Sequence, residues 1–310
     1  MRTPSCRVCS ASKGSHFARD GFQWFRCANC DTVQKLLTVQ EYLGLNPSYD
    51  PGHFLDSRNE AEIREYLNVE NATRLLARVI AAHLPGHSGL RRFLDVGCGM
   101  GAYLLAARAL GFEALGFEPS ANHARVAVEH LKLDVVQDYF SADKVSGKFD
   151  LVMLSHVIEH IYAPREFIHE LLGVLKPGGV LIVVTPNTRG LVAASTGAAW
   201  AMLKPLDHVT LISRRAYEHF DLAERAEVRH YTSEYSFEYA ASMLAALRGN
   251  RARDDGEVDR EVGKPSAVRH TGARTKLLRA ALSAISLPAH VMARAVDRQA
   301  CLNTILVRKP

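Results

Sequence analysis

The chain has 310 residues, of which 47% are hydrophobic and 23% charged, and it carries a formal net charge of +5 at pH 7. These values are those of an ordinary soluble protein that can bury one large core with a smaller attachment. No stretch reaches the roughly 18 uninterrupted apolar residues of a membrane span, and the first residues lack an apolar secretory segment. The sequence therefore predicts a cytoplasmic protein without a transmembrane segment.

Four of the six cysteines lie among the first thirty residues and form two Cys-x-x-Cys pairs. Each pair predicts a knuckle, a tight turn whose two thiolates reach one metal ion, and two knuckles complete a tetrahedral, all-thiolate zinc site. Four cysteines leave no open coordination position, so we expect structural zinc in a ribbon over residues 1–40, with a strand over 22–26 leading into the second knuckle. Disulfides or redox chemistry are the alternative. The predicted ligands are Cys6, Cys9, Cys27 and Cys30.

Residues 41–88 are expected to form a linker and a helical cap. Turn-forming residues crowd positions 46–52, and apolar residues at helical spacing between 59 and 84 predict helices. From Phe93 onward, apolar segments alternate with helix-compatible ones, which favours a parallel sheet covered by helices on both faces. The expected strands are 92–96, 113–117, 133–136, 149–154, 180–184, 227–233 and 302–308.

A glycine-rich loop over residues 97–101 ends the first of these strands, and a helix-compatible segment follows it. Glycines serve where a backbone must turn tightly and lie against a ligand, and Glu118 stands at the end of the next strand, as in one half of a nucleotide-binding sheet. Spacing alone leaves a dinucleotide cofactor open. Asp95, which we place at the mouth of the loop, would repel a pyrophosphate but suits the amino group and sulfonium of S-adenosylmethionine.

With these pieces in order, the chain resembles class I S-adenosylmethionine-dependent methyltransferases over roughly residues 90–310. The resemblance implies an α/β fold with a doubly wound, seven-stranded, mostly parallel sheet whose last strand is antiparallel. It makes residues 89–310 the methyltransferase domain and 234–300 a basic helical insertion. The segments that carry it are the glycine loop and residues 116–120, 149–160, 175–179 and 185–187.

The resemblance also assigns a cofactor site. It places the methionine end of S-adenosylmethionine on Asp95 and the glycine-loop backbone, the ribose hydroxyls on Glu118, and the adenine near residues 119, 138 and 139. A carboxylate can accept hydrogen bonds from both vicinal ribose hydroxyls, which agrees with the role of Glu118. The cofactor-binding candidates are Asp95, Gly97, Cys98, Gly99, Gly101, Glu118, Pro119, Asp138, Tyr139 and Ser155.

Three histidines are candidate bases for removing a proton from the methyl acceptor. His156 and His160 follow the fourth strand, and His208 follows the fifth, in a region that forms part of the acceptor pocket in related small-molecule methyltransferases. By resemblance, Trp200 and Asp207 join His208 as acceptor-site candidates, and His208 is our preferred base. The alternative is a structural role for each histidine. Residues 156–160 also match an inverted zinc-protease pattern, but the segment follows a buried strand directly.

The sequence also bears on the methyl acceptor. A zinc ribbon followed by such a domain resembles enzymes of sugar and polysaccharide biosynthesis, so we expect methyl transfer to oxygen or carbon of a small-molecule or glycan-type acceptor. Residues 248–309 hold 13 Lys and Arg against 6 Asp and Glu, a balance of +7, which leaves RNA or an anionic membrane surface as further partners or reflects a solvated basic face. The rivals are an RNA methyltransferase and a non-catalytic scaffold with the cofactor fold.

Overall fold

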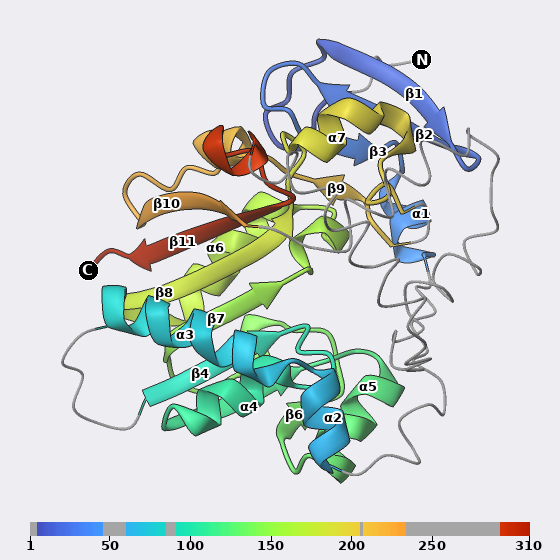
Figure 1. Cartoon of the computed structure of the whole chain (residues 1–310). Helices are drawn as coiled ribbons and strands as arrows, with labels where there is room; N and C mark the ends of the chain where they lie inside the picture. Colours follow the sequence, from blue (N-terminus) through green and yellow to red (C-terminus); the bar gives the residue numbers. More distant parts are fainter. Residues whose placement is uncertain (1–4, 46–59, 85–90, 205–206, 234–291) are drawn as a thin grey trace. The chain divides into compact units, whose positions relative to one another are not determined.

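The computed structural model describes residues 5–45, 60–84, 91–204, 207–233 and 292–310 (Figure 1). The chain divides into two compact units. The first unit takes residues 1–46, 186–216 and 231–303, and the second takes 47–185, 217–230 and 304–310. The predicted linker at 46–52 and the insertion up to residue 291 lie outside the described residues. Among the described residues, no helix combines the length and the apolar character needed to cross a membrane.

The second unit is built on a seven-stranded sheet in the order β10-β11-β8-β7-β4-β5-β6. The pairs β4–β5, β4–β7, β5–β6 and β7–β8 are parallel, and the arrow of β11 runs against that of β7 in Figure 1. The predicted doubly wound fold is therefore confirmed, together with all seven expected strands. The strands are β4 (Arg91–Val96), β5 (Phe112–Phe117), β6 (Asp134–Val136), β7 (Phe149–Ser155), β8 (Leu175–Pro186), β10 (Ala226–Ser233) and β11 (Cys301–Arg308).

Strand β8 is longer than its apolar core predicts, because it begins at Leu175 and includes the Lys-Pro-Gly-Gly segment that follows. A register shift against β7 accommodates this segment, and Gly178 takes a φ of +75° there. At the centre of the sheet, β7 and the second half of β8 form almost continuously apolar, buried runs, and β4 is buried from Phe93 to Val96. Such runs are typical of parallel strands that helices cover on both faces.

Helices flank the sheet strands along the chain. The helices predicted between residues 59 and 84 are confirmed, and the longer one, α3, buries Ala72, Leu76 and Val79 at helical spacing. The helices of this unit are α2 (Glu60–Tyr66), α3 (Val69–His83), α4 (Ala102–Ala109), α5 (Ala121–Arg125) and α6 (Pro164–Val174). A π-helical turn covers Val126–His130, and 3-10 turns cover Ala142–Lys144 and Ile158–His160; a further 3-10 turn, Arg214–His219, begins in the first unit and ends in the second.

The first unit contains a four-stranded antiparallel sheet, β1-β2-β3-β9. The strand predicted at 22–26 is confirmed as β2, and an Asp20-Gly21 turn with positive φ at both residues joins it to β1. This dipeptide in a left-handed conformation is typical of a two-residue hairpin turn. The elements are β1 (Gly14–Arg19), β2 (Phe22–Cys27), β3 (Val33–Lys35), α1 (Val39–Leu43), α7 (Leu191–Thr196), a 3-10 turn (Gly197–Ala199) and β9 (Thr210–Leu211).

The hydrophobic core of the first unit joins segments that are far apart in the chain. Trp24 of β2 and Trp200, which follows α7, are both fully buried in it. The ribbon strands and the segment after β8 therefore share one core. Its buried members are Trp24, Val33, Val192, Ala193, Trp200, Leu203, Leu211, Ala293 and Ala300.

Candidate functional site

The glycine loop follows β4, next to the point where the strand order of the sheet reverses between β4 and β7. Ligands of open α/β sheets bind at such reversal points, outside the carboxyl ends of the strands. Gly97, Gly99 and Gly101 all take positive φ, of +70°, +53° and +92°. A Cβ at Gly97 would lie 2.4 Å from the Cγ2 of Val157, whereas one at Gly99 would meet no described atom within 4 Å. The loop is therefore tightly packed at its start and open beside Gly99.

Glu118 connects the end of β5 to this loop. Its Oε2 accepts a hydrogen bond of 2.8 Å from the Gly99 amide, and its Oε1 accepts one of 2.8 Å from the Ser120 amide. The side chain is only 6% exposed. Because a carboxylate has about four acceptor positions, this arrangement orients Glu118 and leaves acceptor capacity for the two hydroxyls of a ribose.

Asp95 lies within β4 rather than at an exposed mouth of the loop, and it is only 1% exposed. Its Oδ2 has no hydrogen-bond partner among the described residues. Burial, and secondarily the charge of Glu118, raise the pKa of Asp95 to about 8. An ionised carboxylate buried without a partner is strongly unfavourable, so this position fits a ligand that brings a positive charge or a hydrogen-bond donor.

Cys98 is a buried member of the glycine loop, and burial raises the pKa of its thiol well above the ordinary value. The thiol packs toward β5, where a Cβ on Gly116 would lie 2.7 Å from its Sγ. A neutral, packed thiol agrees with the small side chain that the loop requires. The backbone of Cys98, rather than its sulfur, is therefore the part that can contribute to the cofactor site.

The adenine-side candidates are more exposed than the loop. Pro119 follows Glu118 directly, and Asp138 and Tyr139 follow β6, where Tyr139 is 67% exposed. The Lys144 ammonium lies 2.5 Å from Asp138 Oδ2, and this hydrogen bond lowers the pKa of Asp138. The geometry thus brings together Asp95, the glycine loop and Glu118. The roles of Pro119, Asp138 and Tyr139 at the adenine stay predictions.

The segment after β7 contains a histidine held by a buried carboxylate. Ser155 ends the strand, and His156 takes a left-handed φ of +55°. The Nδ1 of His156 lies 3.2 Å from Glu159 Oε1, and Glu159, fully buried, accepts a 3.0 Å hydrogen bond from Thr185 Oγ1 on its other oxygen. A carboxylate can only accept, so His156 carries its proton on Nδ1 and its lone pair on Nε2 when neutral.

His160 ends the short 3-10 turn Ile158–His160. The inverted zinc-protease pattern requires a continuous helix for its ligands, and the left-handed His156 followed by a three-residue turn does not form one. The sequence pattern at 156–160 therefore does not produce that kind of site. The orienting role of Glu159 was not predicted, because nothing in the sequence ties it to Thr185.

His208 belongs to the first unit, where it is 4% exposed. Its Nδ1 donates a hydrogen bond of 2.6 Å to the carbonyl oxygen of Met202, which again leaves the lone pair on Nε2 of the neutral ring. Of the other acceptor-site candidates, Trp200 is a fully buried core residue. Asp207 has an electrostatic interaction with Lys35, a fully buried lysine whose pKa burial lowers to about 8.

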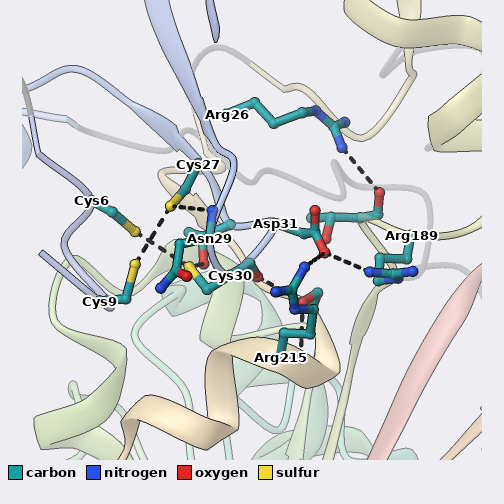
Figure 2. A network of polar contacts seen from close by, with 12 residues as sticks. Cys6, Cys9, Arg26, Cys27, Asn29, Cys30, Asp31, Arg189 and Arg215 are labelled. Atoms are coloured by element: carbon teal, nitrogen blue, oxygen red, sulfur yellow. Dashed lines mark hydrogen bonds and ion pairs between the residues drawn. The ribbon is translucent and has the colours of Figure 1, made fainter. Parts of the chain in front are cut away.

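The four N-terminal cysteines converge in the first unit (Figure 2). Their sulfur atoms all lie within 4.8 Å of one another, with Cys6–Cys30 and Cys9–Cys27 at 3.5 Å. These separations exceed the roughly 2.05 Å of a disulfide. They approach the spacing of about 3.8 Å that a tetrahedral zinc ion imposes on sulfur ligands at about 2.3 Å.

The two knuckles have the same backbone geometry. The amide of Ser10 bonds to the carbonyl of Cys6 at 2.9 Å, and the amide of Asp31 bonds to that of Cys27 at 3.1 Å. Ser10 and Asp31, each directly after the second cysteine of a pair, both take a left-handed conformation. Two matching turns that point four thiols at one place fit the donor set of a structural zinc ion.

The second knuckle is joined to the segment after β8, which the sequence did not predict. Asp31 Oδ2 accepts hydrogen bonds from Arg189 at 2.7 Å and Arg215 at 3.4 Å, and Ser213 Oγ donates to the Cys30 carbonyl at 2.8 Å (Figure 2). Strand β3 pairs with β9 in the same region, and β9 has only two residues. A strand this short has no periodicity that sequence analysis could detect.

Comparison with known proteins places this geometry in a family. A family model described as "Methyltransferase domain" matches residues 62–222, which is more than half of the chain. Residues of the chain are 35% identical over 124 positions to the mitochondrial ubiquinone biosynthesis O-methyltransferase of Mus musculus, covering 36% of this chain and 33% of the mouse enzyme. The ubiquinone biosynthesis O-methyltransferase of Caulobacter vibrioides is 32% identical over 118 residues, covering 35% of this chain and 47% of that enzyme. The match thus spans less than half of either relative.

Solved structures show weaker similarity. A S-adenosylmethionine-dependent methyltransferase from Archaeoglobus fulgidus is 19% identical with a TM-score of 0.42, covering 76% of this chain and 94% of that one. The cyclopropane synthase MmaA2 from Mycobacterium tuberculosis is 17% identical with a TM-score of 0.44, covering 76% and 84%. Neither similarity bears on what this chain binds or catalyses. On the strength of the family model and of the sheet that carries the glycine loop, the chain belongs to the class I methyltransferase-domain family.

Proposed function

We propose that this protein is a S-adenosylmethionine-dependent methyltransferase that transfers a methyl group to oxygen of a small-molecule acceptor. The observation that carries the proposal is the buried carboxylate of Asp95, which has no described partner and lies beside an open glycine loop in a methyltransferase-family sheet. The names of the two curated relatives favour oxygen over carbon. A glycan-type acceptor stays a prediction, and the basic insertion that suggested RNA lies mostly outside the described residues.

The second unit would hold the cofactor through three groups. Asp95 would accept hydrogen bonds from the amino group of the methionine moiety, the amides of the glycine loop would face its carboxylate, and Glu118 would accept from the ribose hydroxyls. When bound, S-adenosylmethionine supplies an electrophilic methyl group on a sulfonium. The residues themselves contribute position, since in-line displacement depends on near-attack geometry.

A hydroxyl acceptor must lose its proton as the new bond forms, and His208 is our candidate for the base. The Met202 carbonyl fixes its Nδ1 as the donor, so Nε2 is the nitrogen that accepts a proton. His156 is the second candidate, because Glu159 orients its ring in the same manner and would stabilise the protonated form. His160 stays a third candidate from the sequence.

The N-terminal ribbon would bind zinc through Cys6, Cys9, Cys27 and Cys30. The close sulfur atoms and the paired turns support this assignment. With four cysteines there is no open position on the metal, so the role is structural. Because the ribbon shares its core with residues 191–203, zinc would also stabilise the segment that leads to His208.

Calorimetry and a labelled-methyl assay test the proposed function together. The zinc-loaded protein should bind S-adenosylmethionine, and Glu118→Gln should weaken binding by about tenfold or more through loss of charge-assisted hydrogen bonds. Extracts incubated with methyl-labelled cofactor should then carry label in the small-molecule fraction. Absence of binding heat would make the protein a scaffold, and label in RNA would move the proposal to an RNA methyltransferase.

A further inference from the structure

Three arginines from separate segments converge beside the second knuckle (Figure 2). Arg189 and Arg215 donate to the same oxygen of Asp31, at 2.7 and 3.4 Å, so their donor nitrogens lie within about 6 Å of each other. Arg26 of β2 donates to the carbonyl of Thr188, the residue before Arg189, at 3.3 Å. The Asp31 carboxylate bonds to two of these guanidinium groups and interacts electrostatically with the third, that of Arg26, so three positive charges share one negative charge.

Within the part of the chain that the structure describes, much of the hydrogen-bonding capacity of this cluster is unused. A guanidinium has five N–H donors, yet the half-buried Arg26 makes this one long hydrogen bond among the described residues. The hydroxyl of Thr188 is buried in a residue that is 1% exposed, and it has no described hydrogen-bond partner. Buried polar groups are nearly always paired, so the Thr188 hydroxyl indicates a missing partner, while the side chains of Arg189 and Arg215, 44% and 40% exposed, leave donors that a ligand can reach.

The position of the cluster relates it to the proposed acceptor segment. Thr188 and Arg189 lie shortly after the end of β8. Arg215 lies shortly after β9, the strand that follows His208 in the chain. Asp31, held at a left-handed φ of 57° by the second knuckle, orients two of the guanidinium groups. The ribbon therefore supplies the residue that arranges the arginines, as well as Arg26 itself.

We propose that Arg26, Thr188, Arg189 and Arg215 form a binding site for a phosphate or diphosphate group carried by the methyl acceptor. Guanidinium forks recognise phosphate oxygens bidentately, and a hydroxyl adds a further donor. This inference rests on the proposed methyl transfer and narrows its acceptor to a phosphorylated small molecule. A single compact cluster suits one such group, whereas an RNA backbone is bound by charges spread along a stripe.

The test is calorimetric titration of the full-length, zinc-loaded protein with inorganic phosphate, pyrophosphate and a nucleoside diphosphate sugar. Thr188→Val is the decisive variant, because it nearly keeps the side-chain volume and removes a hydroxyl that has no hydrogen-bond partner among the described residues. It should leave the melting temperature and zinc content unchanged and weaken pyrophosphate binding by about tenfold. Arg26→Gln should weaken it by about a hundredfold, while the control Arg74→Ala, which removes an exposed helix arginine, should have no effect.

The different ligands and variants of this experiment distinguish the possible outcomes. The diphosphate sugar should bind at least about tenfold more tightly than inorganic phosphate if the acceptor carries the group, and equal affinities would overturn the acceptor part of the proposal. Wild-type affinity for pyrophosphate in both Thr188→Val and Arg26→Gln would overturn the site. The site would also be overturned if the protein bound RNA with steep salt dependence but bound neither phosphate nor pyrophosphate. S-adenosylmethionine titrated in the same samples reports separately on the proposed function, since its residues are all in the second unit.

Discussion

The two units of this protein build their sites in opposite ways. In the second unit, Asp95, the glycine loop and Glu118 lie within 24 consecutive positions, on neighbouring parallel strands whose apolar residues form the core. In the first unit, the cysteine cluster is joined to residues after β8 through a two-residue strand, one shared core and contacts such as Asp31–Arg189. The proposed cofactor site thus depends on local chain geometry, and the proposed acceptor segment depends on contacts between remote segments.

This difference implies different sources of stability. The sheet of the second unit buries long apolar strands, so burial of apolar surface is its main driving force. The ribbon of the first unit has short strands, and β1 is mostly exposed along its length. Small modules of this kind commonly need a metal or another crosslink to stay folded. Loss of the metal should therefore affect one unit far more than the other.

Removal of zinc should have the largest effect, and the two units should differ in how strongly they respond to it. A structural zinc site contributes apparent binding energies of about 10–16 kcal/mol, so Cys27→Ser or chelation should unfold the ribbon and release residues 191–203. Methyl transfer should fall to background, while S-adenosylmethionine still binds to the second unit. Hydrogen exchange followed by peptide gives the measurement, comparing residues 14–35 and 191–203 with residues 91–118.

Cys301→Ala is the matched control for this experiment, because Cys301 is a buried free thiol outside the cluster. It should retain one zinc per chain and lose little activity. Equal loss of protection in both units after chelation would show that they do not differ in metal dependence. Unchanged protection over residues 191–203 would show that the ribbon does not support the acceptor segment.

His208→Ala should lower turnover by about 10²–10⁴-fold, the range in which a positioned general base contributes. Binding of S-adenosylmethionine should not change, because the proposed cofactor residues all lie in the second unit. Added imidazole should restore part of the rate. His130→Ala, a half-exposed histidine at the end of a π-helical turn, is the control. Near-normal turnover of His208→Ala with intact cofactor binding would transfer the role to His156.

Asp95→Asn should weaken binding of S-adenosylmethionine by about a hundredfold, because an amide cannot provide the negative charge for its amino group. The free energy of unfolding of the cofactor-free variant, in contrast, should be higher than that of the wild type at alkaline pH. Since the pKa of Asp95 rises from 3.8 unfolded to about 8 folded, the folded state holds the extra proton between these values, and wild-type stability falls as pH rises through that window. The variant lacks this penalty.

Chemical denaturation at pH 5 and pH 9 measures this second effect. The stability of Asp95→Asn relative to wild type should increase by roughly 2–4 kcal/mol between the two pH values. Binding of the cofactor by the wild type should also release a proton below pH 8, which calorimetry in buffers of different ionisation enthalpy detects. Equal cofactor affinity of variant and wild type would contradict the role of Asp95.

What could be predicted from the sequence follows the same division between the units. The seven strands and the glycine loop were predictable because apolar runs and glycines act locally, and Cys-x-x-Cys spacing made the four cysteines conspicuous. Asp95 was expected at the mouth of the loop, but burial is set by the strands on both sides of β4 and not by its neighbours in sequence. The Glu159–Thr185 contact, and β9 with Ser213, depend on pairing between distant segments, for which single-sequence patterns carry no signal.

Ser213→Ala should give the smallest effect, and it tests the link between the ribbon and the acceptor segment most directly. Its Oγ donates to the Cys30 carbonyl at 2.8 Å and accepts from the Arg215 amide at 3.0 Å, and the residue is fully buried. Removing it takes the hydrogen bond away from a carbonyl of the second knuckle, which costs about 1–3 kcal/mol. Zinc retention against a graded chelator series should weaken accordingly, whereas Ser195→Ala on α7, whose hydroxyl donates to the Val192 carbonyl of the same helix, should not alter it. Ser213 belongs to the first unit, whereas the proposed cofactor residues belong to the second. If Ser213→Ala lost as much affinity for S-adenosylmethionine as for zinc, the proposed independence of the cofactor site from the ribbon would be contradicted.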